Sequence, residues 1–292
     1  DDLVIARGDG TPTYNFCVVI DDWEMKVTHV IRGDDHINNT PRQINLLKAL
    51  NANIPAYAHL SMILGDDGQK LSKRHGAVSV MQYFDQGYLP EAILNYLARL
   101  GWSHGDDEIF SMTDFCQWFD LDHITSSSAQ FNTEKLDWLN SHYIKTLPLE
   151  RIASAIEPYL KEVVHSPIDS NLLIKAIDIH RERANHLTSL ARDIAYIFEY
   201  QKPNQQDFEK HINDEALKLI KSFQAALIKI DWTKEAIHNV MNDVVTLHAI
   251  KFPKLAMPLR VLLTGIAQSP SIDVVMEILG HDETMKRLNL YL

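Results

Sequence analysis

One stretch near the N-terminus restricts the possible folds most strongly. Val27–Ile31 is rich in β-branched residues and predicts a strand, which ends in a charged turn, Arg32–His36. A helix is predicted over Thr40–Leu50, and the apolar run Leu60–Leu64 has strand character. The order strand, charged loop, helix, strand is typical of a parallel α/β sheet, in which ligands lie beyond the carboxyl ends of the strands. Arg32–His36 stands at such an end.

The residues before this stretch give less definite patterns. Leu3–Ala6 has the composition of a strand that already lies inside a sheet. The apolar segment Tyr14–Ile20 fits a buried strand or a helix, because periodicity does not separate the two in so short a run. No initiator methionine precedes the sequence, so we expect an internal fragment or a trimmed form of a longer chain.

A basic loop follows the second predicted strand. Gly65–Gly68 has a sequence typical of a turn, and Lys70, Lys73 and Arg74 then place three cations within five residues. Ser72 and the backbone amides add neutral donors, and a lysine can follow a phosphate as negative charge develops on it. Two interpretations stay open at this point, a loop that holds a triphosphate and an ordinary solvated basic loop.

Arg32 also has two interpretations. An arginine beside two aspartates, here Asp34 and Asp35, is commonly half of an ion-pair network. Alternatively, its planar guanidinium serves as a bidentate clamp for a carboxylate ligand, which it would bind better than a neutral amide.

Composition excludes several classes of protein. The chain of 292 residues is 46% hydrophobic and 23% charged, which is ordinary for a soluble globular protein of about two domains. No apolar run approaches a membrane span and no signal peptide is present, so we expect a cytoplasmic protein without a membrane partner. Cys17 and Cys116 fit buried reduced thiols, and the scattered histidines predict no zinc site.

The net charge of −11 is unevenly distributed along the chain. Residues 77–145 hold three cations against ten carboxylates, whereas the first 76 and the last 147 residues are each near −2. A local basic face could therefore still attract RNA, because local potential steers such binding.

The rest of the chain predicts helices. The longest apolar-periodic stretch, Asn171–Tyr200, has a possible break near Asn185, and Pro203–Gln206 is a linker. In the densest basic group of this helical half, Arg181 and Arg192 stand eleven positions apart and would therefore share nearly one helix face. A solvated face and an RNA contact both fit that group, which consists of His180, Arg181, Arg183, His186 and Arg192.

These motifs together resemble one enzyme family. Lys70–Arg74, followed by His75-Gly76, resembles the K-M-S-K-S signature of class I aminoacyl-tRNA synthetases, in the K-L-S-K-R form typical of glutamyl-tRNA synthetases. Pro12–Phe16 and Val30–Gln43 resemble consecutive motifs of the same family at its usual distance from that loop. The resemblance covers essentially the whole chain, and its further matches are Gly101–Asp106, Phe131–Leu136 and Met257–Val261, the last without a role for Arg260.

The resemblance implies roles for individual residues. Lys73 would stabilise the pyrophosphate leaving group with support from Lys70, and both would act as catalytic residues. Arg32 would grip the side-chain carboxylate of L-glutamate, while Tyr14 would line the amino-acid pocket or, alternatively, be a core tyrosine. ATP, accompanied by Mg²⁺, would contact Lys70, Leu71, Ser72, Lys73, Arg74 and Asp35, and tRNA(Glu) would contact Arg181, Arg183 and Arg192.

The family also implies an architecture and a reaction. An α/β C-terminal half of the class I nucleotide-binding fold would span 1–77, followed by an all-α region with a stem-contact domain at 78–145 and an anticodon-binding bundle in two parts, 146–203 and 204–292. The implied enzyme is a monomeric, cytoplasmic ligase that forms glutamyl-adenylate and transfers glutamate to the 3′-terminal ribose of tRNA(Glu).

One family motif is missing. No H-I-G-H type sequence occurs, so the half of the catalytic domain that carries it is expected before Asp1, and this chain alone is expected not to form the adenylate. An alternative from another functional class is a tRNA-binding or docking module without catalysis.

Overall fold

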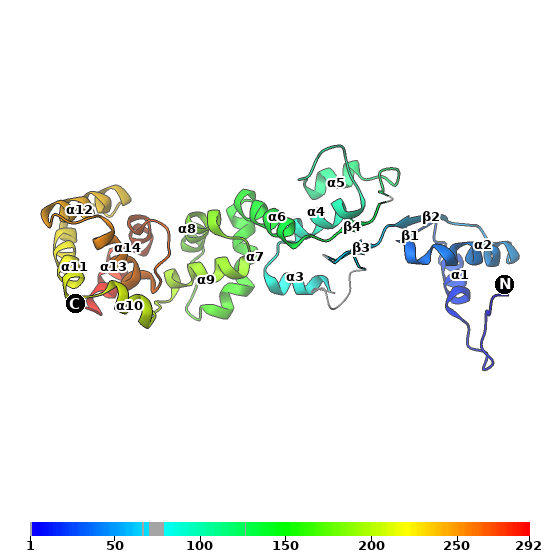
Figure 1. Cartoon of the computed structure of the whole chain (residues 1–292), viewed down its shortest axis with the longest axis horizontal. Helices are drawn as coiled ribbons and strands as arrows, with labels where there is room; N and C mark the ends of the chain where they lie inside the picture. The colour runs from blue at the N-terminus through cyan, green and yellow to red at the C-terminus, as the bar shows by residue number, and fades with distance from the viewer. Residues whose placement is uncertain (1, 66, 70–78, 126) are drawn as a thin grey trace. The chain divides into compact units, whose positions relative to one another are not determined.

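The computed structural model describes residues 2–65, 67–69, 79–125 and 127–292, shown along the chain in Figure 1. The chain divides into two compact units. Unit 1 consists of residues 1–82 and 90–136, and unit 2 consists of residues 83–89 and 137–292. The division into four domains predicted from the sequence is finer than this and stays a proposal.

Unit 1 contains the predicted parallel sheet. Strand β1 (His29–Gly33) pairs in parallel with β2 (Ala56–Leu60), and the register places Arg32 opposite His59. Helix α2 (Thr40–Ala49) connects the two strands, as the sequence predicts, and has a proline in its first turn. A 3₁₀ helix, η1 (Asp34–Asn39), joins β1 to α2, so the charged turn is itself helical.

Three predictions near the N-terminus are settled or corrected. Leu3–Ala6 is not a strand, because only Ala6 forms a bridge, to Pro12. The ambiguous segment forms helix α1 (Tyr14–Glu24). The run Leu60–Leu64 is not one strand, since β2 ends at Leu60 and Ile63–Leu64 forms β3, which pairs with β4 (Ala129–Gln130).

The remaining helices of this region follow the sequence signals closely. Ser111 caps α5 through a capping box with Asp114, in which each side chain bonds the backbone N–H of the other residue. Two helices, α3 and α6, run across the boundary between the units. The helices are α3 (Val80–Gln86), α4 (Pro90–Gly101), α5 (Met112–Trp118) and α6 (Thr133–Thr146).

From Leu149 onward the described chain is helical (Figure 1). The predicted break near Asn185 lies between η3 and α9, and Gly280 interrupts α14 with a φ of 78°. The elements are α7 (Leu149–Val163), α8 (Ser170–His180), η3 (Arg181–Arg183), α9 (Leu187–Phe198), α10 (Gln205–His211), α11 (Asp214–Ala226), η4 (Leu227–Lys229), α12 (Lys234–Leu247), α13 (Pro253–Thr264) and α14 (Ile272–Asn289).

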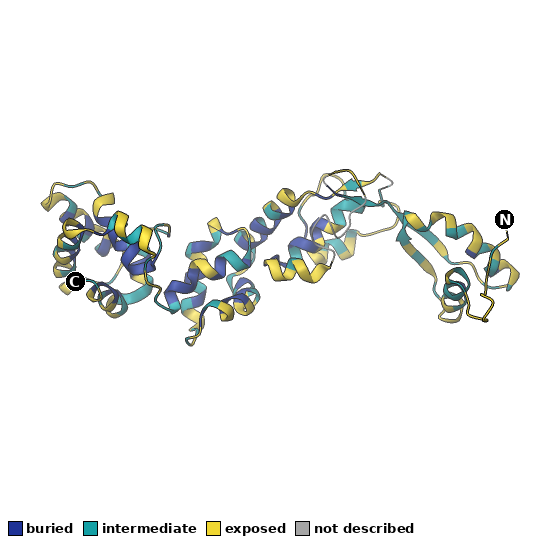
Figure 2. Cartoon of the chain, turned by 60° about the horizontal axis from the view of Figure 1, so that its bottom comes forward, coloured by how far each residue is buried: buried dark blue, intermediate teal, exposed yellow. Residues whose placement is uncertain are grey.

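Burial differs between the sheet and the helices. Figure 2 shows buried residues gathered on the inner faces of the helices, whereas no residue of β1 or β2 is buried. The helical core is mainly apolar and includes Ile156 and Ile194 around α7 and α9, and Leu259 and Val275 around α13 and α14. No helix in the described part of the chain is long and apolar enough to cross a membrane.

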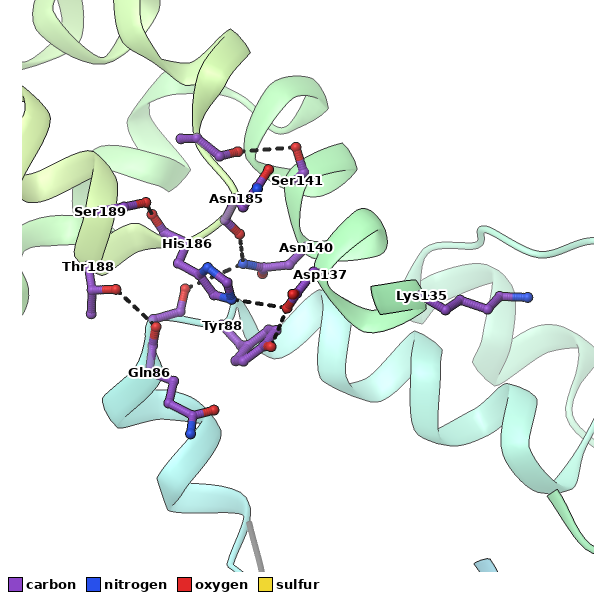
Figure 3. A network of polar contacts seen from close by, with 12 residues as sticks. Gln86, Tyr88, Lys135, Asp137, Asn140, Ser141, Asn185, His186, Thr188 and Ser189 are labelled. Atoms are coloured by element: carbon purple, nitrogen blue, oxygen red, sulfur yellow. Dashed lines mark hydrogen bonds and ion pairs between the residues drawn. The ribbon is translucent and has the colours of Figure 1, made fainter. Parts of the chain in front are cut away.

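A polar network ties Tyr83–Leu89 into unit 2 (Figure 3). The hydroxyl of buried Tyr88 donates to Asp137, and the backbone N–H of Leu89 donates to Asn140 Oδ1 over 2.8 Å. Asn140 Nδ2 in turn donates to the Asn185 carbonyl at 2.5 Å. The network replaces water around several buried polar groups with protein partners, so it fixes this short segment against α6 and the start of α9.

Candidate functional site

Arg32 lies at the carboxyl end of β1, half-buried, and its partners are neutral. Its Nη2 donates to Thr40 Oγ1 and to Gln43 Oε1, each over 2.8 Å. Its Nε lies 3.5 Å from His59 Nε2, and its guanidinium carbon lies 5.4 Å from the centre of the Tyr57 ring. No carboxylate lies within ion-pair distance of Arg32 among the residues that the structure describes.

The local sequence explains this arrangement. Side chains alternate along a strand, and the parallel register brings Arg32 and His59 side by side. Thr40 and Gln43 stand three apart on α2, so they share a face of that helix. Burial, followed by the Arg32 cation, holds the pKa of His59 below its ordinary value, which keeps its ring available as a neutral acceptor.

Arg32 has no carboxylate within ion-pair distance in the described chain, although burial raises the pKa of Asp22 and the Arg32 cation acts electrostatically against that rise. A half-buried cation whose direct hydrogen-bond partners are all neutral can accept an anionic ligand. The hydrogens on Nη2 are already engaged by protein oxygens, so a carboxylate that approaches the present arrangement meets Nη1 first.

Two further predicted residues lie close to this position. Tyr14 begins α1, is 52% exposed and directs its hydroxyl to within 3.4 Å of His36 Nδ1, so it is not a core tyrosine. Asp35 is exposed within η1. A Cβ at Gly33 would lie 2.7 Å from Asp35 Oδ1, so a side chain at this position would require the exposed Asp35 carboxylate to turn away.

The basic loop is not part of this geometry. The residues predicted to bind ATP there, Lys70, Leu71, Ser72, Lys73 and Arg74, lie outside the described residues. Among the residues that are described, no group of three or more histidine, cysteine, aspartate or glutamate side chains is arranged to hold a metal ion.

The basic group predicted to touch RNA is divided by the structure. Arg181 lies in η3, where it pairs with Asp178 at 3.3 Å and donates to the Leu147 carbonyl at 3.4 Å. Arg192 is exposed on α9, a separate helix, so the expectation that these two arginines share one helix face is wrong. Arg183, which is exposed, donates to the Ser269 carbonyl at 3.2 Å.

A second basic group escaped the sequence analysis. Lys210, Lys251 and Lys254 surround a cavity of about 360 Å³, which we call the lysine pocket. These three lysines are exposed, and none has an ion-pair partner among the residues described. His211 and Glu215 also line the pocket, together with Met257 and Pro258.

The first turns of two helices contribute to the lysine pocket. Asn213 and Glu215 belong to the start of α11, and Pro253 and Lys254 belong to the start of α13. The positive end of a helix dipole favours anions at such positions. The lysines come from three separate segments, which is why no charge run in the sequence indicated them.

Two parts of the chain match families of known proteins. Residues 1–138 match the family model described as tRNA synthetases class I (E and Q), catalytic domain, and residues 151–292 match an anticodon binding domain. Glutamate–tRNA ligase from Methylobacillus flagellatus is 61% identical over 290 residues, which is 99% of this chain and 62% of that protein. The corresponding ligase from Dechloromonas aromatica is 55% identical over 292 residues, 63% of its length.

Solved structures give the same result. The crystal structure of a glutamate tRNA ligase from Elizabethkingia meningosepticum, in complex with its amino acid, superposes with a TM-score of 0.84 at 32% identity. It matches 99% of this chain, which covers 62% of that structure. A second structure, from Elizabethkingia anophelis, has a TM-score of 0.79 at 31% identity. The chain thus spans a little over three fifths of the length of the relatives it matches.

Proposed function

Because this chain belongs to the class I tRNA synthetase family that is specific for glutamate and glutamine, we propose that it forms part of a glutamate–tRNA ligase. The proposed enzyme activates L-glutamate with ATP to give glutamyl-adenylate and pyrophosphate. It then transfers the glutamyl group to the 3′-terminal ribose of tRNA(Glu). Mg²⁺ would enter with ATP, and the proposed enzyme works as a cytoplasmic monomer.

The observation that carries this proposal is the environment of Arg32. A cation at the carboxyl end of a parallel strand, held by neutral partners, suits the side-chain carboxylate of glutamate better than the amide of glutamine. Tyr14 opens α1, which packs against α2, the helix that supplies Thr40 and Gln43, and it would border the same ligand.

The basic loop would bind ATP and assist the loss of pyrophosphate. In this proposal Lys73 stabilises the pyrophosphate leaving group as its charge develops, and Lys70 supports it. Leu71, Ser72, Arg74 and Asp35 would complete the contacts with the nucleotide. The support for these roles is the resemblance of Lys70–Arg74 to the family signature.

The anticodon-binding region would recognise tRNA. The lysine pocket offers three cations without ion-pair partners in the described chain, next to the positive ends of two helices, which suits RNA phosphates. Arg192, exposed on α9, remains a proposed contact, whereas Arg181 and Arg183 would have to leave protein partners to reach RNA.

The test of catalysis is glutamate-dependent exchange of pyrophosphate into ATP by the protein that contains these residues. Lys73→Ala should lower the exchange rate by orders of magnitude and leave the affinity for tRNA nearly unchanged. Lys48→Ala, at an exposed position on α2, is the control and should leave both unchanged. The alternative, a tRNA-docking module without catalysis, predicts no exchange and no effect of Lys73→Ala.

The test of RNA binding uses the 292-residue chain and tRNA(Glu) over a series of salt concentrations. Replacing Lys210, Lys251 and Lys254 by alanine should weaken binding and reduce the salt slope by about one unit per lysine in contact with phosphate. Lys161→Ala is the control, because Lys161 already pairs with Glu157 at 2.5 Å. An unchanged salt slope in the triple variant would remove the lysine pocket from the RNA-binding surface.

A further inference from the structure

Gln43 joins three elements of unit 1 through one amide group. The side chain comes from α2 and is buried, with 1% exposure. Its Oε1 accepts a hydrogen bond from Arg32 of β1 over 2.8 Å, and its Nε2 donates to Asn15 Oδ1 of α1 over 3.0 Å. A buried amide is stable only when both of its ends are bonded, and here both are.

The orientation of this amide follows from its neighbours. The guanidinium of Arg32 can only donate hydrogen bonds, so the oxygen of Gln43 must face it. The nitrogen of Gln43 then faces Asn15, which accepts through its own oxygen. Gln43 therefore holds the Arg32 side chain in place and contributes no charge.

We propose that Gln43 is a positioning residue that fixes Arg32 without forming an ion pair with it, so that the positive charge of Arg32 acts on the carboxylate of the amino-acid substrate. This inference rests on the proposed function, in which Arg32 receives that carboxylate. A glutamate at position 43 would occupy the same space and accept the same hydrogen bond from Arg32, with the Asn15 amide turned so that its nitrogen donates to the second oxygen, but it would neutralise Arg32 from within the protein. An apolar residue would preserve the charge of Arg32 and leave its side chain held by Thr40 and His59 alone.

Two variants of similar size separate charge from position. Gln43→Glu keeps a hydrogen-bond acceptor for Arg32 and removes its free charge. Gln43→Met keeps the free charge and removes both hydrogen bonds. We expect Gln43→Glu to raise the KM for glutamate by about tenfold to a hundredfold, the range for the loss of a charge-assisted bond. Gln43→Met should raise it by less, and neither variant should change the KM for ATP.

The measurement is pyrophosphate exchange, at varied glutamate and ATP, by the longer protein that contains these residues, with thermal unfolding of each variant. Gln117→Glu, at an exposed position on α5, introduces the same charge elsewhere and should change neither KM. Arg32→Met tests the underlying proposal separately. If Arg32→Met leaves the KM for glutamate unchanged, the assignment of Arg32 itself fails.

Three results would overturn the role of Gln43 even if Arg32→Met behaves as expected. The first is an unchanged KM for glutamate in Gln43→Glu. The second is a larger increase in Gln43→Met than in Gln43→Glu, because position alone would then matter. The third is a Gln43→Glu chain that does not fold, since the proposal requires that a carboxylate be accepted in this space.

Discussion

His186 Nε2 lies 3.1 Å from Asp137 Oδ1, and the same carboxylate accepts the hydroxyl hydrogen of Tyr88 (Figure 3). The Tyr88 and His186 rings also meet edge to face, with centroids 4.6 Å apart. Burial and the adjacent Asp137 raise the pKa of Tyr88, so its hydroxyl stays protonated and remains a donor. One carboxylate of α6 thus fixes two rings from separate segments of unit 2.

The first prediction concerns this carboxylate. Asp137→Ala should destabilise unit 2 by about 1 to 3 kcal/mol, because the buried Tyr88 hydroxyl loses its acceptor. Tyr88→Phe should cost measurably less in the Asp137→Ala background than in the parent chain. Urea unfolding of the two single variants and the double variant measures this coupling. Strictly additive losses would mean that the two side chains do not stabilise each other.

The second prediction concerns Gly87, whose φ is +89°. A Cβ at this position would lie 2.6 Å from the backbone nitrogen of Thr188, so Gly87→Ala adds a backbone clash to the strain of a positive φ. Gly105→Ala is the control, because Gly105 also has a positive φ but its Cβ would meet open space. Gly87→Ala should lower the free energy of unfolding by about 1 to 3 kcal/mol more than the control. Equal losses would show that the segment shifts at no cost.

The third prediction concerns pH. His180 is buried, its Nδ1 lies 2.8 Å from the Ala176 carbonyl and its Nε2 lies 3.3 Å from the Tyr196 hydroxyl. Burial lowers the pKa of His180 below its ordinary value of 6.5, so the unfolded chain binds a proton more readily than the folded chain. The contribution of neutral, buried His180 to the stability of the fold is therefore complete above pH 6.5. It is lost as the pH falls through the pKa of His180 in the folded state.

The measurement is the Tm of the chain and of His180→Gln between pH 7 and pH 5. The parent should lose more stability on acidification than the variant does, because the variant lacks this titrating group. His165→Gln, at an exposed position after α7, is the control and should retain the parent's pH dependence. A His180→Gln chain with the parent's full pH dependence would contradict the prediction.

The fourth prediction concerns Arg287, which is 2% exposed. It donates to Glu283 Oε1 at 2.8 Å and to the Leu263 carbonyl at 2.7 Å. Arg287→Met should destabilise the chain by about 2 kcal/mol or more, because it leaves both acceptors without this donor. Lys286→Met is a matched control on the same helix, since Lys286 also pairs with Glu283 but is exposed, and it should cost less than about 1 kcal/mol. Thermal unfolding measures both, and equal losses would be inconsistent with this account.

Local sequence signals predicted much of the fold. The β-branched run before Arg32 and the periodicity of Thr40–Leu50 both act within a few residues, and the strand and helix that they predict both appear in the structure. The strand predicted at Leu3–Ala6 is absent. A segment with the composition of a strand becomes one only when a partner strand pairs with it, and here Ala6 forms only a single bridge.

The site was less predictable than the fold. Arg32 could be identified because it ends a predicted strand, but its neutral partners depend on which residues of α1, α2 and β2 meet there. The lysine pocket was missed because Lys210, Lys251 and Lys254 are brought together only by helix packing. Arg181 and Arg192 were wrongly placed on one face because the spacing rule applies only within an unbroken helix.

The chain passes from one unit to the other three times, after Gln82, Leu89 and Leu136. Residues 83–89 therefore belong to unit 2, whose other residues begin nearly fifty positions later in the sequence. A protease that cuts near residue 136 would leave neither piece complete, because one would carry this segment without Asn140 and Leu187 and the other would lack it. Dissection or recombination of the protein must therefore follow its spatial bodies, since no single crossover in the gene separates them.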